Sequence, residues 1–386
     1  MSKSLPTEII SHEIFSKLPV KSLLRFKCVS KSFYALISSP EFVELHLQES
    51  RSSDANRVLI LAGKDRRNLY SIDVDSPDSV TTIPLPHSLG KWRPREVSVV
   101  GSFDGLICVG LGVGKDNFTR FKHVLINPST RVFREIPYKH TFVFSSILGY
   151  FRSSFGFGFD DLNRDFKFVK ITEADGIDLL LNTVVKGREV MVYSSNKNTW
   201  KLAEMEKDRV DSVTTEGQNG VLIKNHLLHW VFLVPNSKHY RIGCFDTLSE
   251  KWVRHVPLTE ELFEDNKKFR MLSLRVINGC LCLYTGTVVW MLKDYGAKES
   301  WVKLFHITDQ FLRSRLFQFT RTVFCSSRES KDEVLVPKLN GKGLFWYDIG
   351  PITYSRLRKV KRIPAFVRGC FITESLVQIP GGRHIS

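Results

Sequence analysis

The sequence predicts an α+β protein of two domains, with a bundle of short helices at the N-terminus and an all-β propeller after it. The chain has 386 residues, more than one ordinary domain needs. Apolar residues follow helical spacing near the N-terminus, whereas from Arg57 onward short apolar runs alternate with Gly, Asn, Asp, Ser and Pro clusters. The chain is 42% hydrophobic, which allows a large core, and its 12% aromatic content suits strands.

The first helix is predicted from the spacing of apolar residues after Pro6. Pro6 fits the first turn of a helix, where its missing N–H is not needed. Ile10, Ile14 and Leu18 then follow at i, i+4 and i+8, which places them on one helical face. Pro19 is expected to end this helix.

Two further short helical segments are predicted before residue 50. An apolar segment follows Pro19 directly, and Ser30 is a suitable N-cap for the third helix. Phe33, Leu36 and Ile37 lie at i, i+3 and i+4 of that helix. We expect Pro40 to close it, with only a short apolar tail beyond.

The amount of apolar surface on these helices is unusual for so short a segment. A bundle of this size is marginal by itself, yet nearly every predicted helix face carries Ile, Leu or Phe. Some of this surface should therefore remain exposed for a partner. From the residues alone, a helical cap packed on the second domain explains the pattern equally well.

The N-terminal motif resembles the F-box of plant F-box proteins. The resemblance rests on three runs, Leu5–Ile10, Leu18–Lys31 and Leu36–Phe42, which cover almost the whole motif in order. One departure is Phe33, where the family often has Trp. The resemblance implies an F-box over residues 1–50 that docks onto a Skp-type adaptor, which bridges to a cullin.

Residue roles in the F-box follow by position from this resemblance. The residues expected to face the adaptor are Leu5, Pro6, Ile9, Ile10, Leu18, Pro19, Leu23 and Leu24. The residues expected to close the bundle internally are Val29, Ser30, Phe33 and Ile37.

A small unit recurs through the second region, which we assign to residues 57–380. An apolar pair near Asp or Asn, a polar turn and then an aromatic residue appear, for example, from Phe245 to Trp252 and from Tyr193 to Trp200. Six copies end at positions 80, 133, 200, 252, 301 and 354, at intervals of 53, 67, 52, 49 and 53. This period predicts a propeller of six kelch-like blades. The wide interval before Trp200 indicates an insertion at Glu173–Glu189.

This second region also resembles the F-box-associated domain that follows the F-box in many plant proteins. The matching segments are Gly101–Cys108, Asn127–Thr130, Gly156–Asp160, Leu228–Trp230 and Asn278–Cys282. Together the two resemblances cover nearly the full chain. They imply a receptor that holds a protein target.

Residues 110–115, Gly-Leu-Gly-Val-Gly-Lys, superficially resemble a phosphate loop. A P-loop would need Gly at Val109 and Ser or Thr at Asp116, and no helical pattern follows. A glycine-rich hairpin tip is the better interpretation.

Histidine and cysteine pairs give no metal or catalytic signal. His226 and His229 are three residues apart, so on a strand they would lie on opposite faces. Cys280 and Cys282 share a face but have no second pair nearby, which is typical of core residues. We therefore expect no metal, no cofactor and no catalytic residue, and a non-enzymatic protein.

The positive charge lies mainly in the second region. The net charge is +16, whereas residues 1–50 contribute only six Lys or Arg against five Asp or Glu. A possible basic patch consists of Arg356, Arg358, Lys359, Lys361 and Arg362. It is explained either as a charged edge strand that resists aggregation or as a surface for an acidic target. Nucleic-acid binding is not indicated, because no aromatic residues interleave with the basic ones.

These observations predict the substrate-recognition subunit of an SCF-type (Skp–cullin–F-box) ubiquitin ligase, which delivers a protein target for degradation. The alternatives are an adaptor-bound scaffold that does not promote degradation, and a basic protein that binds nucleic acid or acidic surfaces. Target choice should lie in loops, with Tyr138–Ser154, Glu173–Glu189 and Glu204–Asn219 as the candidate segments.

Cysteine usage and hydropathy bear on the location of the protein. Seven cysteines are scattered without paired spacing, which is typical of reduced, buried thiols. No apolar run is long enough to span a membrane, and charged residues interrupt the first twenty positions. We therefore expect the protein in the cytoplasm, the nucleus or both.

Overall fold

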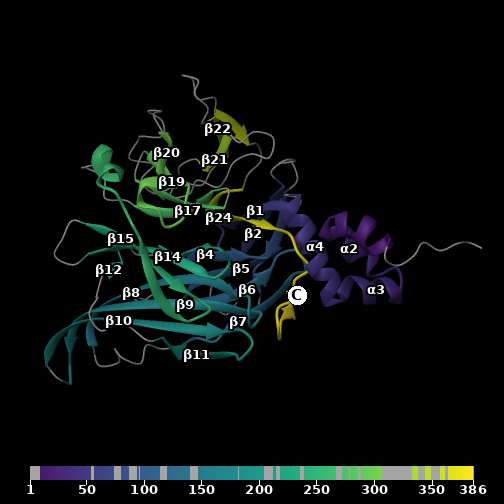
Figure 1. The fold of residues 1–386 in the computed structure, drawn as a ribbon. Coiled ribbons are helices and arrows are strands. Elements are labelled where there is room, and N and C mark those ends of the chain that lie inside the picture. Colours follow the sequence, from purple (N-terminus) through teal and green to yellow (C-terminus); the bar gives the residue numbers. More distant parts are fainter. Residues whose placement is uncertain are drawn as a thin grey trace, which may run out of the picture. The chain divides into compact units, whose positions relative to one another are not determined.

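A computed structural model of the chain provides the fold (Figure 1). The residues that the structure describes are 9–53, 56–73, 80–86, 94, 96–113, 120–139, 147–180, 182–203, 212–213, 218–234, 239–266, 272–277, 279–285, 288–306, 333–337, 344–348, 357–360 and 364–385. They divide into two units, the first formed by Met1–Glu135 with Lys361–Ser386 and the second by Ile136–Val360.

Helices occupy the start of the first unit. They are a π-helical turn η1 (Ile10–Ile14), a 3₁₀ turn η2 (Phe15–Lys17), and the α-helices α2 (Val20–Phe26), α3 (Lys31–Ser38) and α4 (Pro40–Ser52). The first helix is therefore not the regular α-helix that the spacing predicted. Its first part, η1, has the wider π geometry, and its second part, η2, has the tighter 3₁₀ geometry. It ends before Pro19 as expected, because Leu18 adopts the extended conformation favoured before proline.

Two serines begin the longer helices. The Ser30 hydroxyl accepts a hydrogen bond from the Phe33 N–H at 3.1 Å, which confirms the predicted N-cap of α3. Ser39 caps α4 in the same way through the N–H of Phe42, at 3.1 Å. Helix α3 ends at Ser38, before Pro40 as predicted, and Ser39 adopts the extended conformation favoured before proline. The expectation of only a short tail beyond it is wrong, because Pro40 occupies the first turn of the 13-residue helix α4.

Two antiparallel sheets complete the first unit. One has the order β24-β1-β2-β3, with β1 (Arg57–Gly63), β2 (Asn68–Asp73), β3 (Val80–Pro84) and β24 (Phe366–Thr373). The other has the order β25-β7-β6-β5-β4, with β4 (Glu96–Phe103), β5 (Leu106–Val113), β6 (Arg120–Asn127), β7 (Val132–Ile136) and β25 (Arg383–His384). Strands from the two ends of the region thus share a sheet, since β1 pairs with β24.

Four antiparallel sheets form the second unit. The first is β11-β10-β9-β8, with β8 (Ile147–Asp160), β9 (Asp165–Asp178), β10 (Thr183–Ser194) and β11 (Thr199–Leu202). The second is β12-β14-β15-β16, with β12 (Ser212–Val213), β14 (Leu227–Leu233), β15 (Tyr240–Asp246) and β16 (Lys251–Val256), and with β13 (Val221–Ile223) pairing β14.

The other two sheets of this unit come later in the chain. One is β17-β18-β19-β20, with β17 (Ser273–Ile277), β18 (Cys280–Tyr284), β19 (Val288–Leu292) and β20 (Trp301–His306). The other is β21-β22-β23, with β21 (Glu333–Pro337), β22 (Leu344–Asp348) and β23 (Leu357–Val360). Two 3₁₀ turns, η4 (Glu260–Asn266) and η5 (Lys298–Ser300), lie between strands.

The repeated sequence unit corresponds to the last hairpin of a sheet. Tyr193 lies directly opposite Trp200 across β10 and β11, and Phe245 lies opposite Trp252 across β15 and β16. Their rings are in contact, with centroids 5.5 Å and 5.4 Å apart. The recurrence arises because large side chains on paired strands stabilise each hairpin.

The prediction of six complete blades needs a correction. The described residues form six sheets, of which five have four or five strands, but the sixth, β21-β22-β23, has three. The repeat spacing located this last hairpin but could not show its strand number, since a period counts units and not the strands in each.

Sheets of the second unit pack against one another through apolar faces. Val169 and Ile171 of β9 join Trp230 and Phe232 of β14 in one buried cluster. A second cluster, which includes Val231 and residues of β17 and β18, joins the next pair of sheets. Each sheet alone would expose these faces, so stacking provides the core.

The predicted insertion at Glu173–Glu189 is not a loop. Its residues form the outer parts of β9 and β10, which pair in continuous register from Thr183–Asp178 to Ser194–Lys167. The β-branched residues of this segment, among them Ile177, Val184 and Val185, favour strands over an irregular loop.

Candidate adaptor-binding site

The N-terminal helices enclose a small apolar core of their own. Its buried members are Phe15, Val20, Leu23, Ile37, Phe42 and Leu376. The Phe15 ring contacts those of Phe26 and Phe33, with centroids 5.2 Å and 5.0 Å away. Phe33 therefore takes the place of a larger aromatic residue within this core, and Ile37 closes the bundle as predicted.

The predicted adaptor-facing residues divide between surface and core. Ile9 is 43% exposed and Pro19 is also exposed. Ile10, Leu18 and Leu24 are half-buried and pack against the helical core. Leu5 and Pro6 lie outside the described residues.

Leu23 is the one member of the predicted set that the structure places wholly inside the bundle. Its side chain has no exposed surface, because it lies on the inner face of α2 with Val20. The assignment of Leu23 to a partner-facing role is therefore corrected to a core role. Helical spacing alone could not separate the two faces of so short a helix.

Three further apolar residues of the helices are exposed and were not assigned to the adaptor. They are Ile14, Val29 and Tyr34, with exposed fractions of 41%, 66% and 59%. The prediction that Val29 closes the bundle is wrong, because Val29 lies exposed in the turn after α2. The available signal for Tyr34 was its position next to Phe33, because consecutive residues of an α-helix point about 100° apart.

His46 fixes the corner between η2 and α2. Its Nε2 lies 2.8 Å from the carbonyl oxygen of Leu18, and the ring is fully buried. Burial lowers the pKa of His46, so the neutral ring donates this hydrogen bond at physiological pH. The bond positions Leu18 and Pro19, two of the predicted adaptor-facing residues.

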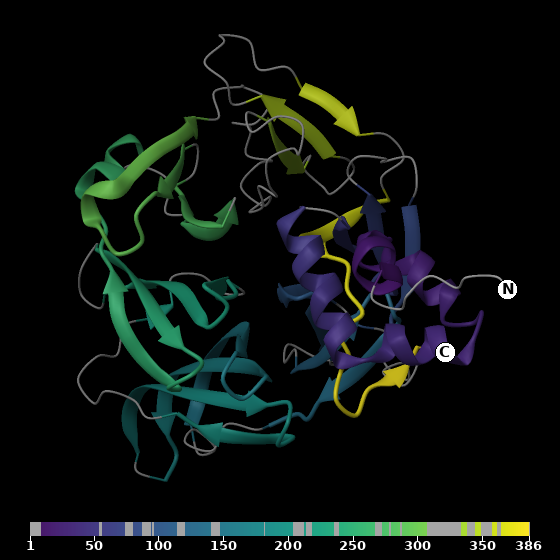
Figure 2. The same ribbon diagram turned by 45° about the vertical axis from the view of Figure 1, so that its right-hand side comes forward.

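A C-terminal segment, Glu374–Ile379, joins the helices to the two sheets of the first unit; we call it the C-terminal strap. Leu376 is buried in the helical core. The side-chain amide of Asn127 donates to the carbonyls of Ser375 and Val377, at 3.1 and 2.8 Å. Figure 2 shows the strap, in yellow, running beside α4.

The turn between β4 and β5 contacts the C-terminal strap. The Ser375 hydroxyl donates to the Asp104 carbonyl at 2.5 Å, and the Asp104 carboxylate forms an ion pair with Arg51 of α4. Gly105 follows with a φ of +78°, and a Cβ at this position would clash with the Ser375 side chain. The turn thus needs glycine both for its conformation and for the close approach of the strap.

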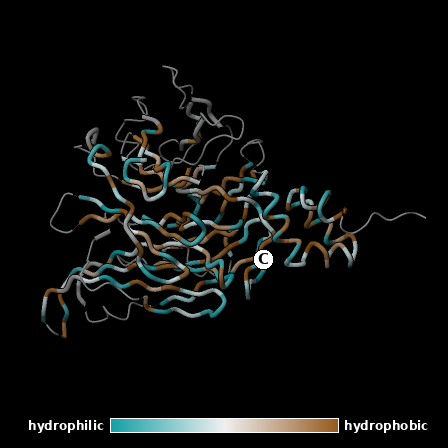
Figure 3. The backbone as a smooth tube through the Cα atoms, viewed as in Figure 1, coloured by the Kyte–Doolittle hydropathy of each residue, from teal (hydrophilic) through white to brown (hydrophobic). Residues whose placement is uncertain are grey.

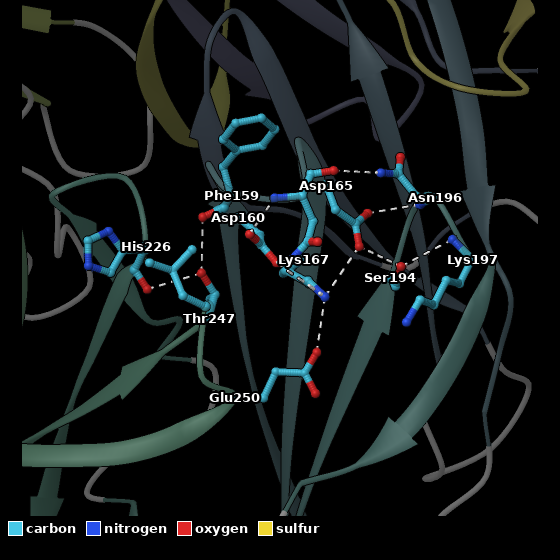
Figure 4. Close-up of polar contacts among 12 residues, drawn as sticks. Phe159, Asp160, Asp165, Lys167, Ser194, Asn196, Lys197, His226, Thr247 and Glu250 are labelled. Carbon is cyan, nitrogen blue, oxygen red and sulfur yellow. Dashed lines mark hydrogen bonds and ion pairs between the residues drawn. The ribbon is translucent and has the colours of Figure 1, made fainter.

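A second candidate site is a buried polar cluster around Lys167 on β9 (Figure 4). The Lys167 Nζ lies 3.0 Å from Glu250, 3.3 Å from Asp165 and 3.8 Å from Asp160. Lys201 also pairs with Glu250, at 2.9 Å. Glu250 lies in the turn between β15 and β16, so the cluster links two neighbouring sheets of the second unit.

The carboxylate of Asp165 is fully engaged by the chain itself. It accepts hydrogen bonds from the hydroxyls of Ser194 and Ser195, at 2.5 and 2.8 Å, and from the N–H of Asn196 at 2.8 Å. Nearby, Thr247 Oγ1 lies 3.1 Å from the carbonyl oxygens of both Phe159 and His226. With its groups already paired, this cluster supports the fold.

The charges of this cluster stabilise one another. Burial alone would lower the pKa of Lys167, but the hydrogen bond and ion pair with Glu250, together with Asp165, outweigh it and raise that pKa. Burial likewise opposes the ionised form of Glu250, yet hydrogen bonds from Lys201 and Lys167 hold its pKa below the usual range. Lys167 and Glu250 therefore remain charged near neutral pH, which is unsuited to proton transfer.

The other sequence candidates lie apart from any reactive arrangement. His229 is buried on β14 with its Nε2 2.6 Å from the Tyr295 hydroxyl, and burial lowers its pKa to about 4. Burial raises the pKa of Cys282 to about 12, whereas Cys28 is exposed and so differs from the expected buried thiols. In the part of the chain that the structure describes, no three His, Cys, Asp or Glu side chains could hold a metal.

The glycine-rich residues 110–113 belong to β5, and the next described element is the strand β6. Of the basic patch, Arg358 and Lys359 lie on β23, which is the last strand of its sheet as described. Arg356, Lys361 and Arg362 lie outside the described residues. No described helix is both long and apolar enough to cross a membrane.

Comparison with known proteins identifies the family. Residues 3–45 match the F-box domain family, and residues 59–379 match the family described as the F-box associated beta propeller domain. The chain belongs to the plant F-box proteins with an F-box-associated β-propeller. The helices η1 to α4 are therefore its F-box, and the sheets belong to its propeller domain.

The chain is similar to F-box proteins of Arabidopsis thaliana over most of its length. The chain is 32% identical to F-box protein CPR1, over 97% of this chain and 89% of that protein. It is 29% identical to F-box protein At4g22390, over 89% and 83% respectively. A functionally unknown protein of solved structure from Desulfotomaculum acetoxidans aligns at 12% identity with a TM-score of 0.39, over 81% of this chain and 98% of that one, too low to support an argument.

Proposed function

We propose that this protein is the substrate-recognition subunit of an SCF-type ubiquitin ligase. The observation that carries the proposal is the complete F-box at residues 3–45, joined to a propeller domain over residues 59–379. Plant F-box proteins are in general substrate receptors of such ligases, and an F-box implies binding to a Skp-type adaptor. Through that adaptor the chain would reach a cullin.

The exposed apolar side chains of the F-box support an adaptor-binding role. Ile9, Ile14, Val29 and Tyr34 are all more than 40% exposed within the helical segment that runs from η1 to α3. Apolar side chains that remain exposed in this number favour a protein partner. Pro19, exposed at the corner that His46 supports, would contribute to the same surface.

The receptor would act without changing any covalent bond itself. By holding a target near the ubiquitin-charged enzyme, it would replace a bimolecular encounter with one at high effective concentration. Family members are typically adaptors of this kind. The location we propose is the cytoplasm, the nucleus or both.

The charge of the propeller region favours an acidic protein as the target. Of the net charge of +16, nearly all lies outside residues 1–50. Such a surface would speed association with a negatively charged partner and would do so less at high salt.

Reconstitution tests the proposal directly. The full chain would be mixed with a purified Skp-type adaptor and analysed by size-exclusion chromatography, and then assembled with a cullin, its RING partner and a ubiquitin-charged enzyme. We expect co-elution with the adaptor and ubiquitination that depends on the F-box. Absence of an adaptor complex at micromolar concentrations would overturn the proposal; a complex that supports no ubiquitination would favour a scaffold.

A further inference from the structure

The sheet formed by β8–β11 extends well beyond its neighbours at one end. Strands β8 and β9 have 14 residues each and β10 has 12, about twice the usual strand length. β11 pairs only with Met191–Ser194 of β10. The outer parts, 147–153 and 173–188, therefore form a three-stranded ribbon, which we call the tongue; it projects at the lower left of Figure 1.

Exposed apolar residues are concentrated on the tongue. Thirteen large apolar side chains are exposed in the described part of the chain, and five of them are here. These are Phe151 at 44%, Ile177 at 46%, Leu179 at 65%, Leu180 at 83% and Val184 at 77%. Figure 3 shows the projecting end in the brown of hydrophobic residues. A cluster of this kind on a soluble fold indicates an interaction site.

The turn at the tip holds its leucines outward. The Leu180 N–H donates to the Asp178 carboxylate at 2.8 Å, and the Asn182 N–H donates to the Asp178 carbonyl at 2.7 Å. Asn182 adopts a left-handed conformation with a φ of +52°. Leu179 and Leu180 therefore occupy an ordered turn, at positions where polar residues are usual.

The root of the tongue is fixed by a half-buried ion pair. The Arg188 guanidinium donates to the Glu173 carboxylate at 2.6 and 3.2 Å across β9 and β10. It also lies over the Phe232 ring of the next sheet, 4.7 Å from the centroid. The tongue is thus held as a rigid extension of the propeller domain, which lowers the entropic cost of binding to it.

The backbone of the tongue offers a strand edge. No described strand pairs with β10 between Thr183 and Glu189 on the side away from β9, since β11 pairs from Met191 and the Ala203 N–H donates to the Val190 carbonyl. Such an edge can accept an extended segment as an additional strand. Val184 lies on this edge, one turn from the exposed leucines.

The charge of the tip differs from that of the whole chain. Residues 174–185 contain Asp175 and Asp178 but no Lys or Arg, although the net charge of the protein is +16. Lys186 follows directly and lies opposite Asp175 in the register of β10 and β9, so the carboxylate that a basic segment meets at the tip is that of Asp178. A second copy of this strongly basic chain is a less suitable occupant, because the rest of the surface would repel it.

We propose that the tongue is a target-docking site that binds an extended, apolar segment of the target with a neighbouring lysine or arginine. The segment pairs as a strand with the outer edge of β10. Its apolar side chains contact Leu179, Leu180 and Val184, and its cation lies near Asp178. This inference rests on the proposed receptor function, and it names the part of the propeller domain that receives the target.

Synthetic peptides test the proposal with the full-length protein. Three fluorescent ten-residue probes would be compared at physiological salt: alternating Val–Lys, alternating Val–Glu, and the Val–Lys peptide with two central valines replaced by proline. We expect the first to bind about tenfold more tightly than the other two, because proline removes backbone donors and glutamate removes the favourable charge. Absence of binding, or tighter binding of Val–Glu, would overturn the proposal.

Variants locate the binding site. Leu179→Ser with Leu180→Ser should weaken binding of the Val–Lys peptide by about fivefold or more. Asp178→Asn keeps an oxygen acceptor for the turn and should reduce only the preference for Val–Lys over Val–Glu. Leu162→Ser is the matched control, since Leu162 is 82% exposed in the β8–β9 turn at the other end of the same strands. Equal effects of the control and the double variant would overturn the assignment.

Two additional measurements separate the remaining outcomes. Sedimentation of the wild-type and double-variant proteins reports self-association; a dimer that the leucine variant dissociates would make the tongue an interface between copies and overturn the docking proposal. Co-elution with the adaptor should be the same for all these variants. If the peptides do not bind while the adaptor still co-elutes, the docking proposal is refuted and the proposed receptor function is not.

Discussion

The F-box and the tongue both expose apolar residues, but they are stabilised in different ways. The core of the F-box includes Leu376, so it is completed by a segment more than 300 residues away in the sequence. The tongue consists of consecutive strands and is held by local pairing and by the Glu173–Arg188 ion pair. Changes in the distant strap should therefore damage the F-box, whereas changes in the tongue should leave the fold intact.

The largest expected effect comes from removing the C-terminal residues. A chain that ends at Val360 lacks β24 and Leu376, so it loses the partner strand of β1 and part of the helical core at once. We expect loss of cooperative unfolding, followed by circular dichroism, and aggregation in size-exclusion chromatography. A monomeric truncated chain with a cooperative transition would contradict the role of the strap.

A single substitution in the strap should also be costly. Leu376→Ala removes a side chain that is 3% exposed and should lower the free energy of unfolding by about 2–4 kcal/mol. Leu180→Ala makes the same change on the exposed tongue and should alter stability by less than about 0.5 kcal/mol. Urea denaturation of both variants measures the difference, and equal values would remove the contrast between the two regions.

Mild acid should destabilise both units through buried histidines. The folded-state pKa of His229 is about 4, below the 6.5 of an unfolded chain, so only the unfolded state gains this proton as the pH falls from 7 to 5. The free energy of unfolding should fall by about 2 kcal/mol between pH 8 and pH 5 for this residue. Burial also lowers the pKa of His46, so this residue should likewise reduce the free energy of unfolding as the pH falls. Burial raises the pKa of Glu374, so this residue should increase the free energy of unfolding as the pH falls.

Urea midpoints at the two pH values check this prediction. His229→Gln keeps a donor toward Tyr295 but cannot titrate, so its stability should depend less on pH than that of the wild type. An equally steep dependence in the variant would show that other groups control the acid response.

Adaptor binding should be lost without a loss of stability. Leu5→Ala combined with Pro6→Ala should weaken the adaptor complex at least about tenfold, because truncated apolar anchors commonly cost about 1–3 kcal/mol each. Co-purification with the adaptor and thermal unfolding of the free chain measure the two quantities. Undiminished co-purification would refute the assignment of these residues.

The smallest effect on stability is expected from shortening the tongue. Replacing Ile177–Val184 with Asn-Gly joins Gly176 to Val185, which are paired residues of β9 and β10, by a two-residue hairpin turn. The melting temperature should change by less than about 3 °C, because most of the described side chains that are removed are exposed. A large fall would show that the tongue is part of the core.

Local chemistry made much of the fold predictable from the sequence. The N-cap at Ser30, the start of the strand region at Arg57 and the Tyr193–Trp200 hairpin all depend on neighbours within about ten residues, and the structure has each of them. Helix α4 was missed because Pro40 both follows the end of α3 and begins the next helix, and only the backbone shows the second role.

Features that depend on contacts between residues far apart in the sequence could not be predicted from it. Nothing near Leu376 in the sequence indicates that it packs among the F-box helices, because such a contact follows no local period. The tongue was detected as an extra length of chain but was taken for a loop. Of the candidate site, the sequence located the F-box, whereas the inward position of Leu23 and the exposure of Val29 required the structure.

The position of the strap also has a consequence for biosynthesis. Leu376 and β24 follow all the sheets of the second unit in the sequence. The F-box helices are translated first, but their core and the first sheet lack Leu376 and β24 until the ribosome has passed these residues. Nascent chains that reach only into the second unit therefore hold an incomplete F-box, and full packing of the F-box follows synthesis of the propeller strands.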